Sequence, residues 1–200
     1  DRNPAAGRLH TGSFERMAKP ITTAAIPDTG FAELPFDLEH FLPYLEAGLH
    51  RYQGAEGIGI RTWFNGPESF TPDGRYMLGE SPDVEQLFIA AGFNSIGIQS
   101  AGGVGQVMSQ WLAKRRPPMD LWEVDVRRFQ SFQNDPEYLE ARTAESLGLL
   151  YAMHWPYQQY ETARKIRTSP FYDATRSKGA CFGELAGWER PNWYANAGDS

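Results

Sequence analysis

The sequence has one cysteine and four histidines among its 200 residues. Cys181 cannot form a disulfide within the chain, and so few cysteines are typical of a protein from a reducing compartment. We expect it to be a buried structural thiol rather than a catalytic one. The histidines lie at positions 10, 40, 50 and 154 and show neither HxxxH nor HExxH spacing, so no metal site is expected.

Long apolar runs and clusters of positive charge are also missing. No apolar stretch approaches the roughly 20 residues that a membrane-spanning helix needs, so we expect no membrane span. The 25 acidic residues outnumber the 19 basic ones and give a net charge of -6, which argues against nucleic acid as a partner. Neither a G-x-S-x-G elbow nor a G-x-x-x-x-G-K-[ST] loop is present.

Apolar and aromatic residues, in contrast, are abundant. They make up 41% and 14% of the chain, enough for a sizeable core in one large domain or two small ones. Large aromatic side chains pack cores, and they also line pockets for flat ligands. A change in composition at Pro117-Pro118, beyond which aromatic residues become dense, favours a domain boundary there.

Hydrophobic periodicity predicts a mixture of helices and short strands. The expected elements, in chain order, are a strand over 8–14, an extended connection over 15–36, a helix over 37–51, strands over 58–65, 76–78 and 87–91, and helices over 103–114 and 136–150. Asp135 is the expected N-cap of the last helix, with Pro136 in its first turn and Leu139, Thr143, Leu147 and Leu150 on one face. Residues 151–200 show little periodicity.

The stretch from Leu87 to Trp111 is the most informative. Its apolar run stops at Gly92, a polar loop follows, and Gly102 and Gly103 precede a helical pattern. A helix N-terminus has unpaired N–H groups and a partial positive charge, and glycine lets a ligand approach the backbone closely. The pattern therefore suits a phosphate, a carboxylate or a flavin pyrimidine. Tight packing of a strand on a helix would also call for small residues.

Several longer motifs resemble one family. The segments NGPESFTPDGRYMLGESP and FIAAGFNSIGIQSAGGVGQVMSQWL, at 65–82 and 88–112, resemble the C-terminal part of the FAD domain of D-amino-acid-oxidase-like amine oxidoreductases. Sarcosine and dimethylglycine dehydrogenases and dimethylglycine oxidases are the relevant members. Their central domain is similar to PPMDLWEVDVRRF, YAMHWP, RTSPFYD and GACFGELAGWERPNWY, at 117–129, 151–156, 167–173 and 179–194.

The resemblance implies an α+β fold and a chain that is a middle slice of a longer protein. Residues 1–116 would be the C-terminal part of the FAD domain, with antiparallel substrate-domain strands and one strand and helix of the FAD layer. Residues 117–200 would be an irregular central domain leading to a folate-binding aminomethyltransferase-like domain. The GxGxxG that binds the ADP pyrophosphate, and the histidine that carries flavin in some members, would precede Asp1.

The resemblance also assigns site residues. In this family, the loop after the last FAD-domain strand passes beside the flavin ring, and the next helix points its N-terminus at the pyrimidine edge. These positions correspond here to Phe93, Asn94, Ser95, Ile96, Gly97, Ile98, Gly102 and Gly103. The NGPESFTPDG turn would lie near the substrate cavity, which makes Phe70, Thr71 and Asp73 substrate-proximal. No catalytic residue is assigned.

The implied activity is oxidation of an N-methyl or secondary amine such as sarcosine or dimethylglycine, with FAD as cofactor. Tetrahydrofolate would accept the one-carbon unit in the full-length protein, and electron-transfer flavoprotein or oxygen would accept the electrons. The location would be cytoplasmic in a bacterium and the mitochondrial matrix in a eukaryote. Two alternatives remain: a non-catalytic regulator similar to the pyruvate dehydrogenase phosphatase regulatory subunit, and a module that only spaces two active domains. The fragment alone is expected to be inactive.

Overall fold

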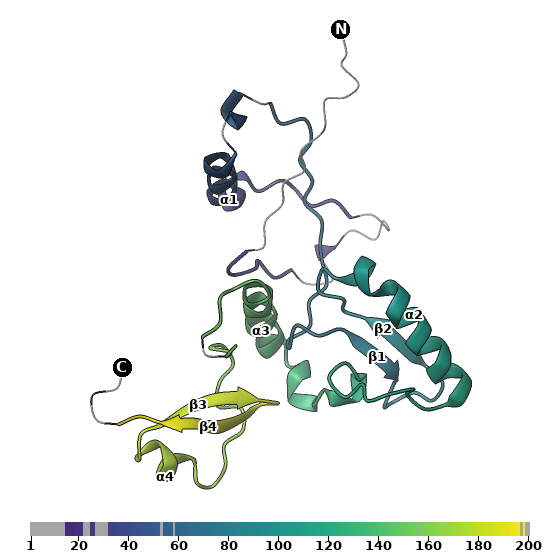
Figure 1. Cartoon of the computed structure of the whole chain (residues 1–200), viewed down its shortest axis with the longest axis vertical. Coiled ribbons are helices and arrows are strands. Elements are labelled where there is room, and N and C mark those ends of the chain that lie inside the picture. Colours follow the sequence, from purple (N-terminus) through teal and green to yellow (C-terminus); the bar gives the residue numbers. More distant parts are fainter. Residues whose placement is uncertain are drawn as a thin grey trace. The chain divides into compact units, whose positions relative to one another are not determined.

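The computed structural model describes residues 15–21, 25–26, 32–52, 54–57, 59–155, 157–196 and 198. The chain divides into two units, the first made of residues 1–15 and 21–67 and the second of 16–20 and 68–200 (Figure 1). Each is described by itself below. The strand expected over 8–14 lies outside the described residues.

The first unit contains the helix expected over 37–51. It is α1 (Leu38–Arg51), and the Asp37 side chain caps it by accepting a hydrogen bond of 3.1 Å from the backbone N–H of His40. A short 3₁₀ turn, η2 (Ala55–Gly57), follows. Pro43 lies beyond the first turn, where its missing N–H removes one hydrogen bond from the helix. Packing offsets this loss, since Phe41 makes an edge-on contact with Trp63 at 5.6 Å between ring centroids.

The strand expected over 58–65 is wrong for the part that the structure describes. Residues 59–65 have no strand assignment. The segment is fixed instead at its end, where Leu34 N–H donates to the Asn65 carbonyl at 2.6 Å and the Asn65 amide donates to the Pro35 carbonyl at 2.8 Å. Apolar alternation indicates a strand only if a second strand offers its backbone groups in register, and the pattern does not reveal that partner.

The second unit begins with an antiparallel pair, β1 (Met77–Glu80) and β2 (Phe88–Ala91), in which Met77 lies opposite Ala91. Both strands start one residue later than expected. On its other edge β1 is joined by the chain at Val124 and Asp125, because Leu78 N–H donates to the Val124 carbonyl at 2.7 Å. The sheet therefore ties the residues before Pro117 to those after it.

Helix α2 (Gly97–Lys114) runs along this sheet and closes the core (Figure 1). Met108 and Trp111 are buried with Leu78, and Val104 packs against them. The helix begins at Gly97 rather than at 103, so the expected start is wrong by six residues. Glycine disfavours a helix interior by about 1 kcal/mol, but this apolar stripe on the sheet decides the conformation.

The remaining elements in the described part of the chain are two 3₁₀ turns, two helices and a hairpin. In chain order they are η3 (Val126–Arg128), η4 (Ser131–Asn134), α3 (Pro136–Leu149), α4 (Tyr172–Arg176), β3 (Ala180–Leu185) and β4 (Trp188–Tyr194). Helix α3 has the expected N-cap, Asp135, which accepts from Tyr138 N–H at 3.0 Å. Its expected apolar face is only half-buried, and the buried residues are Tyr138, Arg142, Ala144, Glu145 and Ser146.

The β3–β4 hairpin corrects the expectation of an irregular region after residue 150. Ala186 and Gly187 form its two-residue turn with φ values of 51° and 83°, and Leu185 pairs with Trp188. Two successive positive φ values match the twist of antiparallel strands. The sequence signal was present in the glycine of LAGW, but alanine at the first turn position obscured it. With helices and small antiparallel sheets, the fold is α+β, as the resemblance implied.

Candidate functional site

Two segments assigned to the site come together at Asn94, whose exposed fraction is 1%. Its Oδ1 accepts from the backbone N–H of Thr71 at 2.8 Å, and its own backbone N–H donates to the Ser69 carbonyl at 3.3 Å. Its Nδ2 donates to the Gly92 carbonyl at 2.6 Å. We call this set of contacts between Ser69–Thr71 and Gly92–Asn94 the Thr71–Asn94 clasp. It fixes the start of the Phe93–Ile98 loop.

The loop is held in an unusual conformation. Asn94 and Ser95 both have positive φ, at 47° and 67°, which is ordinary for asparagine but uncommon for serine. Contacts on each side maintain it: Phe93 stacks on Tyr76 at 5.3 Å between centroids, and Ser95 Oγ donates to Glu68 Oε2 at 2.5 Å. Backbone conformations of this kind cost about 1–3 kcal/mol and cluster at functional sites.

The loop leads directly into the N-terminus of α2, which lacks a side-chain cap. Ile96 is the N-cap residue and makes no capping hydrogen bond, and the first turn carries no acidic residue. The Ile98 side chain is 99% exposed there. The unpaired N–H groups and the helix dipole therefore offer positive potential at this end to an electron-rich group.

The other two glycines assigned to the flavin are placed differently from expectation. Gly102 and Gly103 lie in the second turn of α2, not at its start, because the helix begins at Gly97. Both are exposed, and a Cβ atom at either position would meet nothing within 4 Å. Their N–H groups are directed along the helix axis toward the preceding turn. Their contribution to a flavin site can therefore only be a helix surface free of side chains.

Thr71 and Asp73, assigned near the substrate, are engaged with protein groups. Thr71 is 3% exposed, and its hydroxyl donates to the Arg75 carbonyl at 2.8 Å. Asp73 accepts from Arg128 through Oδ2 at 2.6 Å and Oδ1 at 2.9 Å. Its Oδ1 is also within 3.1 Å of the Thr71 hydroxyl. A carboxylate with these partners holds a turn together and is not poised as a base.

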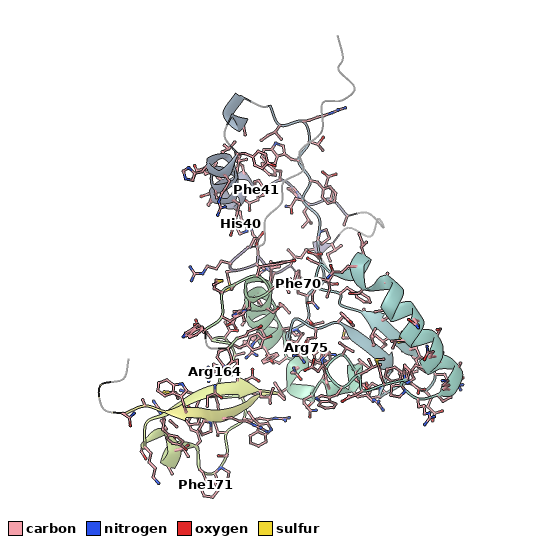
Figure 2. The ribbon with its side chains drawn as sticks, in the orientation of Figure 1. His40, Phe41, Phe70, Arg75, Arg164 and Phe171 are labelled. Carbon is pink, nitrogen blue, oxygen red and sulfur yellow. The ribbon has the colours of Figure 1, made fainter. Side chains whose placement is uncertain are left out.

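Helix α3 also contacts this turn. Ser146 Oγ donates to the Thr71 carbonyl at 3.1 Å. Figure 2 labels Phe70, which precedes the turn, and Arg75, which ends it. Sequence reasoning missed Ser146 and Arg128, which lie 75 and 55 positions along the chain from their partners. No local motif signals a pairing at such a separation.

Charged pairs lower the pKa values of two acids in the second unit, Asp125 and Glu189. Burial raises the pKa of the Asp125 carboxyl, but the Arg127 side chain and backbone, together with the charge of Arg128, lower it to a net value below the usual one. The hydrogen bond from Arg164 lowers the pKa of Glu189 against the effect of burial. Both acids are therefore held ionised.

Arg164 and His154 both have structural contacts. Arg164 lies beside the hairpin (Figure 2) and donates to the carbonyls of Tyr160 and Phe182, so it ties loops together. His154 Nε2 lies 2.8 Å from the Leu149 carbonyl. Among the described residues, no three acids, histidines or cysteines gather as a metal site, and none of the helices is long and apolar enough to cross a membrane.

Comparison with known proteins identifies the segment that supplies Arg128 and Ser146. Residues 116–169 match the family described as FAD dependent oxidoreductase central domain. This segment belongs to that family. Arg128, Arg142 and Ser146 are therefore central-domain residues, and the loop at Thr71–Arg75 is held by the central domain.

Similarity to curated proteins extends over nearly the whole chain. It is 45% identical to 4-methylaminobutanoate oxidase (formaldehyde-forming) of Paenarthrobacter nicotinovorans, over 98% of this chain and 24% of that protein. It is 36% identical to the mouse mitochondrial pyruvate dehydrogenase phosphatase regulatory subunit, over 94% of this chain and 21% of that protein. It is 34% identical to human mitochondrial sarcosine dehydrogenase, over 93% of this chain and 20% of that protein. The chain thus spans about a fifth to a quarter of these relatives.

Proposed function

We propose that this chain is part of an FAD-dependent oxidoreductase that oxidises an N-methylated or secondary amine. The observation that carries the proposal is the Thr71–Asn94 clasp, which brings the loop assigned to the flavin and the turn assigned to the substrate together beside the uncapped N-terminus of α2. The names of two similar proteins, a 4-methylaminobutanoate oxidase and a sarcosine dehydrogenase, support methylated amines as the substrate class.

The residues at this end of α2 fit the electron-rich edge of a flavin. The first turn has no acidic side chain to repel it, and Gly97 leaves the approach free of a side chain. The chemistry that FAD would supply when bound is acceptance of a hydride equivalent from the amine. The N–H groups of Asn94 and Ile96 already bond the Ser69 and Phe93 carbonyls. Those of Gly97 and Ile98 in the first turn of α2, together with the α2 dipole, would stabilise the negative charge of the reduced ring, and Gly102 and Gly103 would keep the neighbouring helix surface open.

On the substrate side, the chain would supply shape rather than an acid or base. Phe70 is half-buried beside a turn whose polar atoms are taken up by protein contacts, so Phe70, Thr71 and Asp73 would form a rigid wall near the amine. A free amine can give up hydride without proton removal by the protein, so this wall is compatible with the reaction. Sarcosine, dimethylglycine and 4-methylaminobutanoate are the candidates.

The proposal extends to the parts of the reaction outside this chain. Residues 1–116 would complete an FAD domain and 117–200 a central domain followed by an aminomethyltransferase-like domain. There tetrahydrofolate would take up the one-carbon unit, and electron-transfer flavoprotein or oxygen would reoxidise the flavin. The protein would lie in the cytoplasm of a bacterium or the mitochondrial matrix of a eukaryote; several similar eukaryotic proteins are named as mitochondrial.

The decisive experiment uses the full-length protein purified without added cofactor. We expect a flavin absorbance spectrum that is bleached under anaerobic conditions by sarcosine, dimethylglycine or 4-methylaminobutanoate. The same buffer without any amine substrate is the control. The second candidate is a non-catalytic regulator, which the 36% identity to a phosphatase regulatory subunit favours. A colourless protein that binds no FAD but binds a phosphatase would support the regulator and refute the oxidoreductase.

Gly97→Leu is expected to weaken FAD binding by the full-length protein. A Cβ atom at Gly97 would lie 3.3 Å from Phe93 Cβ, so a larger side chain must move Phe93 and the loop that it begins. We expect roughly a tenfold rise in the dissociation constant of FAD, about 1.4 kcal/mol, together with a shifted visible spectrum. Gly105→Ala is the matched control, because its Cβ meets nothing within 4 Å on the same helix. Unchanged affinity and spectrum in Gly97→Leu would show that the loop is elsewhere.

A further inference from the structure

Arg128 is the main link between the central domain and the turn at Thr71–Arg75. Its side chain is 8% exposed, although arginine is rarely buried without partners. Besides its two bonds to Asp73, its Nη2 donates to the Arg75 carbonyl at 2.6 Å and its Nη1 donates to the Asp125 carbonyl at 3.1 Å. The guanidinium also lies over the Phe129 ring, 4.1 Å from its centroid. These contacts fix its position and its plane.

The contacts of Arg128 continue to the flavin-assigned loop. Asp73 Oδ1 accepts from Arg75 N–H at 3.2 Å and lies 3.1 Å from the Thr71 hydroxyl, whose single proton it shares with the nearer Arg75 carbonyl at 2.8 Å. The backbone N–H of Thr71 in turn donates to the buried Asn94 side chain at 2.8 Å. Three hydrogen-bonded links, with Asp73 and Thr71 as the two residues between, therefore connect Arg128 to Asn94, which starts the strained part of the loop.

We propose that Arg128 is a positioning residue for the amine-oxidising site, an inference that rests on the proposed function. It aligns the Thr71–Arg75 turn on the substrate side and, through the Thr71–Asn94 clasp, the loop on the flavin side. Arginine is required because its planar fork bonds both Asp73 oxygens and a carbonyl at once, which a lysine cannot do. The central domain thereby sets the geometry of a site that lies outside it in the sequence.

A matched ion pair separates positioning from general stability. Arg164 bonds Glu189 through Nε at 2.8 Å and Nη2 at 2.5 Å, and it also donates to two carbonyls. None of these contacts reaches residues 69–75 or 93–98. The variants Arg128→Met and Arg164→Met therefore remove similar charged hydrogen bonds from the same unit, and only the first is connected to the site.

The test compares these variants in the full-length protein, with Arg128→Lys as the conservative variant. For Arg128→Met we expect a loss of kcat/KM of roughly 10- to 100-fold at unchanged FAD content, as for a small misplacement of reacting groups. We also expect an altered flavin spectrum and faster amide hydrogen exchange at 69–75 and 93–98. Arg128→Lys should restore these properties in part, and Arg164→Met should leave all of them as in the wild type.

Hydrogen exchange keeps the two proposals distinguishable. If the wild-type protein neither binds FAD nor oxidises an amine, the proposed function fails, whereas faster exchange at 93–98 in Arg128→Met alone would still show that Arg128 orders this loop. Equal exchange and equal kcat/KM in Arg128→Met and Arg164→Met would overturn it. If Arg128→Met does not accumulate as folded protein, Arg128→Lys carries the test, and wild-type exchange and kinetics in that variant would overturn the inference.

Discussion

Replacing Arg142 with methionine is expected to lower the free energy of unfolding of the second unit by about 3–5 kcal/mol. Arg142 is 1% exposed and is the largest fully buried side chain among the described residues. Its Nη1 donates to Glu184 Oε2 at 2.6 Å, and its Nη2 donates to the Thr162 carbonyl at 2.7 Å. It thus joins α3, the 160–164 segment and β3.

The size of the effect follows from what the substitution leaves behind. The Glu184 side chain is only 4% exposed, so without Arg142 a buried carboxylate loses its counter-charge. The guanidinium also lies between two aromatic rings, 5.2 Å from the centroid of Tyr138 and 4.2 Å from that of Tyr160. Methionine can fill part of this space but provides neither charge nor donors.

Denaturant unfolding followed by aromatic fluorescence measures this loss. Arg190→Met is the matched control, since Arg190 is an exposed residue of β4 and its replacement should change stability by no more than about 0.5 kcal/mol. Hydrogen exchange should locate the effect in α3 and the hairpin. Equal midpoints for the two variants would contradict the inferred role of the Arg142–Glu184 pair.

Gly79→Ala is expected to destabilise the β1–β2 core by about 3 kcal/mol, the sum of a backbone and a packing effect. Gly79 has φ 114°, a conformation that residues with a side chain rarely adopt. Its missing side chain also makes room for Trp111, because a Cβ atom would lie 2.6 Å from Trp111 Cη2. Trp111 is 3% exposed and packs with Leu78 and Met108, so moving it disturbs the core.

Gly74→Ala separates the two contributions. Gly74 also has a positive φ, 68°, but a Cβ atom there would meet nothing within 4 Å. Gly74→Ala should lower the free energy of unfolding by only about 1–2 kcal/mol, which is the backbone part of the effect. Thermal or denaturant unfolding of the wild type, Gly79→Ala and Gly74→Ala measures how much each substitution lowers the free energy of unfolding. If Gly79→Ala is no less stable than Gly74→Ala, the contact between β1 and Trp111 is not as tight as the structure has it.

The sequence predicted those features that depend on neighbouring residues. Asp135 begins a helix because its acceptor side chain satisfies the N–H group three residues ahead, and this predicted cap is confirmed. Asp37 caps the helix expected over 37–51 in the same way, although that cap was not predicted from the sequence. The strands expected over 76–78 and 87–91 are present as β1 and β2, each starting one residue later, with a turn between them. The motifs also identified the FAD-dependent family, and the match of 116–169 to its central domain confirms this.

The tertiary structure alone decided where α2 begins, that residues 59–65 form no strand, and what holds the candidate site. The apolar stripe of α2 is buried against Leu78, and this burial outweighs the unfavourable helix propensity of the glycines in α2. Arg128 and Ser146 reach the Thr71–Arg75 turn from 55 and 75 positions away. Capping and turn formation act over a few residues and can be read locally. Burial and charge pairing act over distance in space, which the order of residues along the chain does not state.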